Sequence, residues 1–98
     1  MKQYRVEIKP TAENDLETRY RQIAEESPQN AMNGYLRVIE AIEKLEILAL
    51  RCPIAPENAD IQQDIRHLVI GEYRALYRVT GDVVEVLHLR HGRVDRKL

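Results

Sequence analysis

Arginine and histidine side chains are concentrated in residues 72–96, where their spacing could create an anion-binding surface. The segment reads EYRALYRVTGDVVEVLHLRHGRVDR, and its candidate residues are Arg74, Arg78, Arg90, Arg93 and Arg96, together with His88 and His91. A guanidinium offers a planar fork of donors that fits a phosphate or a carboxylate, and an imidazole titrates close to neutral pH. These residue types favour binding of a polyanion, with acid–base catalysis beside a bound phosphate as an alternative.

The histidines are poorly placed to share a metal ion. Because His88 and His91 are three residues apart, a strand would turn them to opposite faces of a sheet. His67 is distant from both in the sequence, and no carboxylate cluster accompanies them. We therefore predict no metal and no cofactor. His91-Gly92-Arg93 is instead a candidate general acid or base next to a phosphate clamp, although a polar strand end explains the same residues.

Size and composition are those of one ordinary domain, and we treat residues 1–98 as a single unit. The formal net charge is only −1, but acidic side chains outnumber basic ones in residues 11–60, whereas basic ones prevail at both ends. Cys52 is the only cysteine, so no internal disulfide is possible. The sequence has no apolar leader and no apolar run of membrane length, and it predicts a cytoplasmic protein.

The sequence begins with a predicted strand and a predicted helix. Residues 4–9 alternate apolar and charged side chains, which indicates a strand with one buried face that ends at Pro10. Helical spacing follows, with Thr11 as the expected N-cap of the helix.

A second helix is predicted after a short break. Ser27 is the expected N-cap, and Pro28 takes the first helical position, where its missing N–H costs nothing. The apolar stripe continues at helical spacing from Ala31 to Ala49. We therefore expect one long helix that ends before Pro53 and forms a hairpin with the first helix.

The second half predicts three strands, at about residues 65–70, 72–79 and 83–89. Gly81-Asp82 is the expected turn between the last two strands. The last strand is almost continuously apolar. The sequence does not decide which of its two faces points to the core, because Glu85 argues against one face and His88 against the other. The order of elements predicts an α+β domain, with a helix hairpin packed on one face of a small, mainly antiparallel sheet.

Helices on one face would leave the other face of the sheet open. Because Tyr73, Ala75, Tyr77 and Val79 are the natural core positions of their strand, we expect the alternating residues on the open face. These are Arg74, Leu76 and Arg78. Arginines from the next strand and the tail would join them and form a concave cationic surface for nucleic acid or an acidic peptide. An open sheet face that carries solvated arginines explains the pattern equally well.

Five segments in a fixed order give the sequence a resemblance to the RelE/ParE superfamily of toxins from type II toxin–antitoxin pairs. They are YRVEIKPTAENDL at the start, SPQNA at the opening of the long helix, RCP at its end, YRALYRV in the third strand and HGR near the end. The resemblance covers nearly the whole chain and implies a β-α-α-β-β-β fold with the first strand beside the last. It also implies a growth-inhibiting cytoplasmic toxin, associated with plasmid stabilization. Such a toxin is neutralised by a cognate antitoxin that wraps an extended or helical segment around it.

RelE-like members of the superfamily cut messenger RNA in the ribosome. By resemblance, Arg74 is the phosphate-clamp arginine and Arg93 is the arginine after the last strand. Arg66 and His67 fall where lysine is more usual in this branch. RelE-like tails close with a Tyr or His that transfers a proton, whereas this tail reads Val94-Asp95-Arg96-Lys97-Leu98, so His91 is the candidate substitute.

ParE-like members poison DNA gyrase and lack that catalytic set, and SPQNA, HGR and the long helix hairpin resemble this branch more closely. We predict a ParE-like toxin that acts by binding and is not an enzyme, with a RelE-like ribosome-dependent mRNA endoribonuclease as the alternative. The residues predicted to bind the target or the antitoxin are Arg66, His67, Arg74, Arg78, Arg90, Arg93 and Arg96. A non-toxic interaction module stays open as a third hypothesis, because Val94 stands where ParE-like tails often carry arginine. For the oligomeric state, a homodimer and a heterotetramer with the antitoxin both remain as hypotheses.

Overall fold

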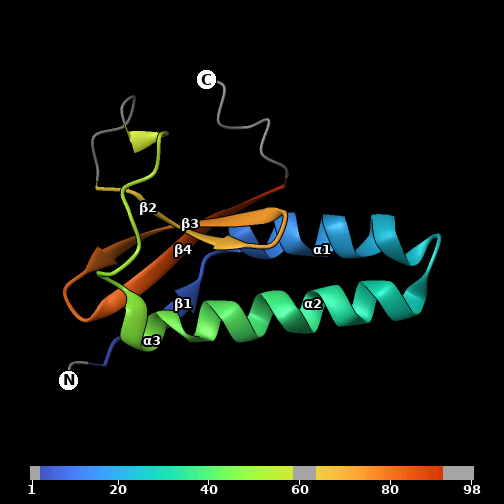
Figure 1. Cartoon of the computed structure of the whole chain (residues 1–98), viewed down its shortest axis with the longest axis horizontal. Coiled ribbons are helices and arrows are strands. Elements are labelled where there is room, and N and C mark those ends of the chain that lie inside the picture. The colour runs from blue at the N-terminus through green and yellow to red at the C-terminus, as the bar shows by residue number, and fades with distance from the viewer. Residues whose placement is uncertain (1–2, 59–63, 92–98) are drawn as a thin grey trace.

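The computed structural model describes residues 3–58 and 64–91 and shows a helix hairpin packed against a four-stranded sheet (Figure 1). The elements in chain order are β1 (Arg5–Ile8), α1 (Pro10–Ala24), α2 (Pro28–Glu43), α3 (Leu45–Leu48), β2 (Arg66–Ile70), β3 (Tyr73–Thr80) and β4 (Val83–His91). This order confirms the predicted α+β arrangement and adds one short helix to it. Within the described ranges, no helix combines the length and the apolar character that crossing a membrane requires.

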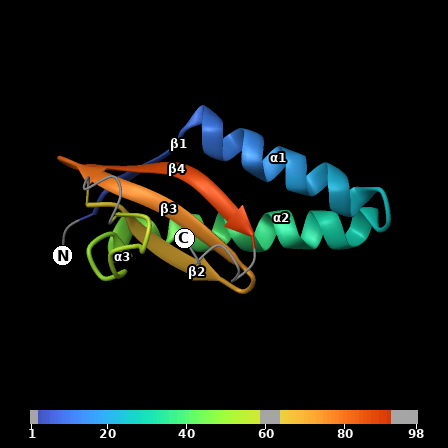
Figure 2. The same ribbon diagram turned by 90° about the horizontal axis from the view of Figure 1, so that it is seen from above.

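The sheet has the strand order β1-β4-β3-β2, so the first strand does lie beside the last. β1 runs parallel to β4, whereas β4, β3 and β2 pair antiparallel. A parallel pair needs a long crossover, and here α1 and α2 belong to that connection. Figures 1 and 2 both show the far end of the α1–α2 hairpin extending beyond the strands.

The start of α1 differs from the prediction, whereas the start of α2 agrees with it. Lys9 is the N-cap of α1 and Pro10 lies in its first turn, so the assignment of Thr11 as N-cap was wrong. Proline favours this position because its fixed φ already suits a helix. The Thr11 hydroxyl instead donates to the backbone oxygen of Leu87 and ties α1 to β4. Ser27 caps α2 as expected, since its hydroxyl accepts from the N–H of Asn30 at 3.2 Å.

The single long helix predicted through Ala49 is also wrong, because α2 ends at Glu43 and α3 follows after Lys44. The N–H of Lys44 donates to the oxygen of Ala41, three residues back, at 3.1 Å, which tightens the helical turn. The apolar stripe nevertheless continues across this break, since Leu45 and Ala49 are fully buried. Sequence periodicity therefore shows no interruption where the backbone has one.

A β-bulge in β4 explains why the inward face of this strand was ambiguous. Tyr77 pairs with Val86 and Leu76 pairs with His88, so Leu87 has no partner in the register. One extra residue changes which side chains face the core. Val86 is buried before the bulge, and Leu89 is buried after it, on the opposite sequence parity.

Among the described residues, Tyr77 is the largest fully buried side chain, and its hydroxyl donates to the backbone oxygen of Ala49 at 2.6 Å. Burial raises the pKa of this hydroxyl, which therefore remains a donor. Tyr77→Phe should lower the free energy of unfolding by about 1–3 kcal/mol, because a buried carbonyl loses its partner. Tyr35→Phe, on an exposed side chain, should change it by less than about 0.5 kcal/mol. Equilibrium denaturation of both variants measures the difference, and equal losses would contradict it.

Candidate functional site

The face of the sheet away from the helices is covered over part of β2 and β3. The chain after α3 returns across it, and Ala55 packs with Ile65 and Leu76 in a second, small hydrophobic cluster. The N–H of Ala55 donates to the oxygen of Ile65 at 2.8 Å. The prediction that Arg74 and Leu76 lie on an open face is therefore wrong, since they are only 4% and 3% exposed.

Arg74 is paired with a loop carboxylate, Glu57, in a two-point contact. Nη1 of Arg74 donates to Oε1 of Glu57 at 3.1 Å, and Nη2 donates to Oε2 at 2.5 Å. The two side chains are 5% and 6% exposed. A guanidinium–carboxylate pair with two parallel hydrogen bonds is a strong and geometrically specific contact. The guanidinium that was predicted to receive a phosphate therefore already holds an anion from its own chain.

Two further side chains complete this group. Nε of Arg90 lies 3.4 Å from Oε2 of Glu57, and Nδ1 of His67 lies 3.1 Å from Nη1 of Arg74. Because a guanidinium can only donate, Nδ1 must be the acceptor, and the His67 imidazole carries its proton on Nε2. We call Glu57, His67, Arg74 and Arg90 the Glu57 cluster.

The hydrogen bonds from Arg74 hold the pKa of the Glu57 carboxyl below its ordinary value of 4.5, against the opposing effect of burial. Its ionisation therefore stabilises the fold above about pH 4.5, and this stability is lost as the pH falls through the lower pKa of the folded state. Wild type and Glu57→Gln should be unfolded with denaturant between about pH 7 and about pH 2. We expect a shallower loss of stability below pH 4.5 in the variant, whereas identical slopes would contradict the lowered pKa.

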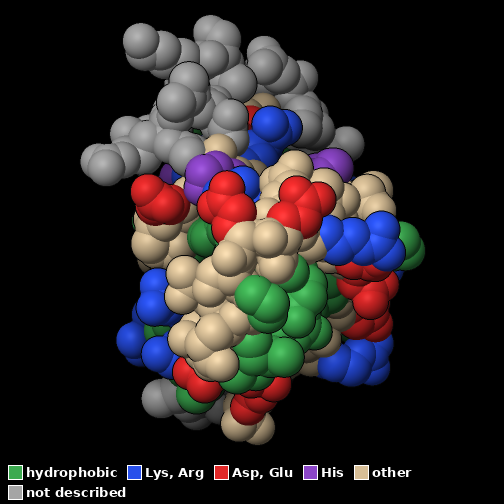
Figure 3. Space-filling model, turned by 90° about the vertical axis from the view of Figure 1, so that its right-hand side faces the viewer, with side chains coloured by type: hydrophobic (Ala, Val, Ile, Leu, Met, Phe, Trp, Pro, Cys, Tyr) green, Lys and Arg blue, Asp and Glu red, His purple; other side chains and the backbone are tan. Residues whose placement is uncertain are grey.

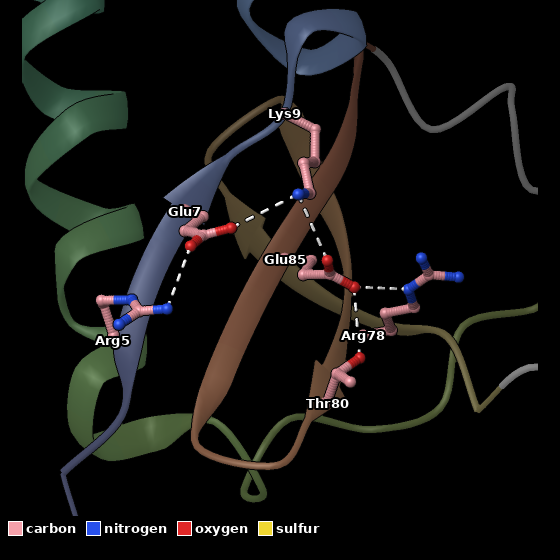
Figure 4. Close-up of polar contacts among 6 residues, drawn as sticks. All are labelled: Arg5, Glu7, Lys9, Arg78, Thr80 and Glu85. Atoms are coloured by element: carbon pink, nitrogen blue, oxygen red, sulfur yellow. Dashed lines mark hydrogen bonds and ion pairs between the residues drawn. The ribbon is translucent and has the colours of Figure 1, made fainter.

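Arg78 belongs to a different group of charges. Its Nε donates to Oε1 of Glu85 at 2.7 Å, and the other oxygen of Glu85 lies 3.3 Å from Nζ of Lys9. The hydrogen bond from Arg78 is the main cause that lowers the pKa of Glu85. Figure 4 shows how this network links β1, β4 and β3 through Arg5, Glu7, Lys9, Arg78, Thr80 and Glu85. Arg78 therefore does not converge with Arg74, although both lie on β3.

The remaining predicted residues are divided among other places. Nη1 of Arg66 donates to the backbone oxygen of Cys52 at 2.6 Å and so fastens the chain that follows α3. Arg93 and Arg96 lie outside the described residues. Of the predicted arginine and histidine residues that lie in the described ranges, the structure brings three together in the Glu57 cluster: His67, Arg74 and Arg90.

His91 lies on the helix side of the sheet. Its ring contacts the ring of Tyr73, with 5.0 Å between centroids, and its Nε2 lies 3.4 Å from Nη2 of Arg19 on α1. Arg74 follows Tyr73 along β3, and successive side chains of a strand point to opposite faces. The candidate proton-transfer residue and the candidate phosphate clamp are therefore separated by the sheet.

A second candidate site is an apolar groove of about 430 Å³ along the helix hairpin, which sequence reasoning missed. We call it the hairpin groove; it is lined by Ile8, Glu13, Leu16, Glu17, Tyr20, Met32, Tyr35 and Ile39. Met32 is 44% exposed and Tyr35 39%, which is unusual for large apolar side chains on one helix face. Figure 3 views the α1–α2 end of the molecule and shows a hydrophobic patch with both acidic and basic side chains around it. The spacing of Met32, Tyr35 and Ile39 on α2 was the signal that could have indicated this groove.

Comparison with known proteins agrees with the fold. The sequence matches the family model for the ParE toxin of the type II toxin-antitoxin system, parDE, over residues 6–96. No curated protein matches the sequence. The structure is similar to the chromosomal ParDE TA system from P. aeruginosa, with a TM-score of 0.78 and 18% identity over 93% of this chain and 98% of that chain. It is also similar to the toxin-antitoxin complex RelBE2 from Mycobacterium tuberculosis, with a TM-score of 0.58 and 26% identity over 91% of this chain and 98% of that chain.

Proposed function

Because the chain belongs to the family of ParE toxins of type II toxin-antitoxin systems, we propose that it arrests growth by poisoning DNA gyrase in the cytoplasm. A cognate antitoxin neutralises it in this proposal. The two solved structures that it resembles are a ParDE system and a RelBE2 toxin-antitoxin complex, which supports a protein antitoxin as the stable partner.

The observation that carries the choice of target is the burial of Arg74. A ribonuclease of the RelE-like kind needs this guanidinium to reach a phosphate, but both of its Nη atoms bind Glu57 and the residue is only 4% exposed. The candidate proton donor His91 contacts Tyr73 on the helix side of the sheet. These placements favour a toxin that acts by binding over one that cleaves RNA.

The hairpin groove is the surface that we propose for the antitoxin. Its exposed apolar side chains recur at helical spacing, which suits an amphipathic helix laid into the groove. Glu13 on its edge favours a helix whose apolar stripe is flanked by lysine or arginine, whereas Glu17 is already paired with Arg21 of the same chain. This differs from the expected acidic segment on a cationic sheet face, because the described arginines of β3 are engaged with carboxylates of the same chain.

Inhibition of purified gyrase tests the target. The purified chain should block DNA supercoiling in a dose-dependent way and leave cleaved DNA trapped on the enzyme, and a preformed complex with the antitoxin should do neither. Full supercoiling activity at a large molar excess of the folded chain would exclude gyrase as the target.

One observation favours the second candidate, a ribosome-dependent endoribonuclease. The Glu57 cluster places a carboxylate and an imidazole beside two guanidiniums, which are the groups that general acid–base cleavage of RNA requires. In this reading the loop that carries Glu57 must move before RNA can enter. Intact messenger RNA after incubation of the chain with translating ribosomes would exclude it.

A further inference from the structure

A polar pocket of about 480 Å³ lies between α1 and the strand ends where Tyr73 of β3 pairs with His91 of β4. Its volume is in the range of small-molecule sites. The hairpin groove is lined by other residues of α1, and the Glu57 cluster lies on the opposite face of the sheet, so the pocket is separate from both. We call it the Arg19 pocket; α1 contributes to its lining Asn14, Asp15, Thr18, Arg19 and Gln22.

The guanidinium of Arg19 is held in place by neutral groups. Nε donates to the hydroxyl of Tyr73 at 3.2 Å, and Nη1 donates to Oε1 of Gln22 at 3.2 Å. Nη2 lies 3.4 Å from Nε2 of His91, which must be the acceptor because a guanidinium can only donate. None of these three partners carries a negative charge, so the described residues fix the position of this cation without neutralising it.

Donors that can bind an external acceptor remain around this cation. A guanidinium has five N–H groups, and the three contacts leave one on Nη1 and one on Nη2. Gln22 accepts through Oε1, so its amide nitrogen is left for another acceptor. Asn14 and Thr18 precede Gln22 by about two turns and about one turn of α1, and their side chains form no hydrogen bond with any described residue. The pocket thus presents a guanidinium fork with neutral donors beside it.

The charges in the pocket favour a ligand with a single negative charge. Asp15 contributes a carboxylate to the lining, and its Oδ2 accepts from the N–H of Leu89 at 3.0 Å and lies 3.5 Å from Nδ1 of His88. These contacts hold Asp15 against β4, but its charge opposes a multiply charged ligand such as a phosphate dianion. Glu72 lies 3.8 Å from Nε2 of His91, and water screens its charge because its side chain is 80% exposed.

We propose that the Arg19 pocket binds a carboxylate. A carboxylate presents two oxygens in one plane, so it can accept from Nη1 and Nη2 of Arg19 at once, and its single charge matches that of the guanidinium. The neutral donors of Gln22, Thr18 and Asn14 add hydrogen bonds without adding charge. The inference goes beyond the proposed function, since neither gyrase poisoning nor an antitoxin helix in the hairpin groove requires a ligand on this side of α1.

Sodium acetate is the first probe of the pocket. NMR of the isotopically labelled chain follows the Nε–H of Arg19 and the side-chain amide of Gln22 while acetate replaces chloride at constant ionic strength. We expect both resonances to shift saturably, with a dissociation constant of about 1–50 mM, because one partly exposed charge pair binds weakly. Shifts that grow without saturation up to about 0.3 M acetate would overturn the proposal.

Gln22→Glu tests the site without removing its arginine. The new carboxylate lies three residues after Arg19 on α1, where it can pair with the guanidinium and compete with acetate. Acetate should then bind at least about tenfold more weakly. Gln29→Glu makes the same change at an exposed position of α2 and should alter the dissociation constant by less than about twofold. Both positions are exposed, so both variants should fold, and equal affinities of the two would overturn the proposal.

Arg19→Lys separates the geometry of the site from its charge. It keeps the positive charge but loses the planar fork, so acetate should bind at least about fivefold more weakly. Arg21→Lys is the matched control on the same helix, because Arg21 pairs with Glu17 and its side chain is 76% exposed. This control should bind acetate as wild type does. Wild-type affinity in both lysine variants would overturn a site built on the guanidinium of Arg19.

A second arm identifies the source of the carboxylate. The probe is the capped peptide acetyl-Ala-Glu-Ala-amide, whose only carboxylate is a side chain, and acetyl-Ala-Gln-Ala-amide is its neutral control. Binding of the acidic peptide at least about tenfold tighter than acetate assigns the pocket to an acidic residue of a partner protein. A smaller difference assigns it to a small free carboxylate. Binding of the neutral peptide as tightly as the acidic one contradicts a carboxylate site.

Discussion

Arg74→Met should lower the free energy of unfolding by about 3–5 kcal/mol, because it leaves the carboxylate of Glu57 buried without its two-point partner. Arg90 does not replace Arg74, since its Nε lies 3.4 Å from only one of the two oxygens. For a domain of 98 residues, a loss of this size is a large part of the total stability. Denaturant unfolding at neutral pH measures it directly.

Two matched variants show whether burial is the cause. Arg78→Met removes an arginine from the same strand whose side chain is 39% exposed in its pair with Glu85, and it should cost less than about 1 kcal/mol. The double variant Arg74→Met/Glu57→Met removes both buried charges and should recover most of the loss. Similar stabilities of Arg74→Met and Arg78→Met would mean that Arg74 is accessible, as the sequence had predicted.

Tyr35→Asp should weaken binding of the antitoxin by about 100-fold, or about 3 kcal/mol, if the hairpin groove is its docking surface. The substitution places a charge in the apolar part of the groove and removes the edge-to-face contact with Tyr20, whose ring centroid lies 5.9 Å away. Co-expression gives a second readout, since the antitoxin should no longer relieve growth arrest by this variant.

Asn33→Asp is the control for this experiment. It adds the same charge to an exposed position of α2 that does not line the groove, so binding should change by less than about threefold. Circular dichroism establishes that both variants are folded. Equal affinities for Tyr35→Asp and wild type would place the antitoxin on another surface.

The fold was predictable because local patterns agree with tertiary structure in most elements. Alternation located the strands, Ser27 with Pro28 located the start of α2, and Gly81-Asp82 located the last turn. Apolar periodicity did not predict two irregularities of the backbone, the break between α2 and α3 at Lys44 and the bulge that contains Leu87. The pattern of apolar residues continues through both. In both places buried side chains continue on either side, so the sequence carries no mark of the irregularity.

The candidate site was less predictable, because it depends on a loop that covers the sheet. Strand alternation correctly turned Arg74 away from the helices, but it does not show that the chain after α3 returns over that face. Glu57 follows Pro56 in a segment without periodicity, and 17 positions separate it from Arg74 along the chain. Such a pairing is set by the path of the connection, and a single sequence does not reveal it.

The central claim is that this member of the ParE toxin family arrests growth through gyrase, and pulse labelling of DNA and protein synthesis in cells tests it most directly. The chain should be induced without its antitoxin, and both rates should be followed from the first minutes. We predict that DNA synthesis fails first while protein synthesis continues. An earlier failure of protein synthesis, with cleaved messenger RNA, would contradict the account and indicate a ribosome-dependent nuclease whose Glu57 segment opens on its target.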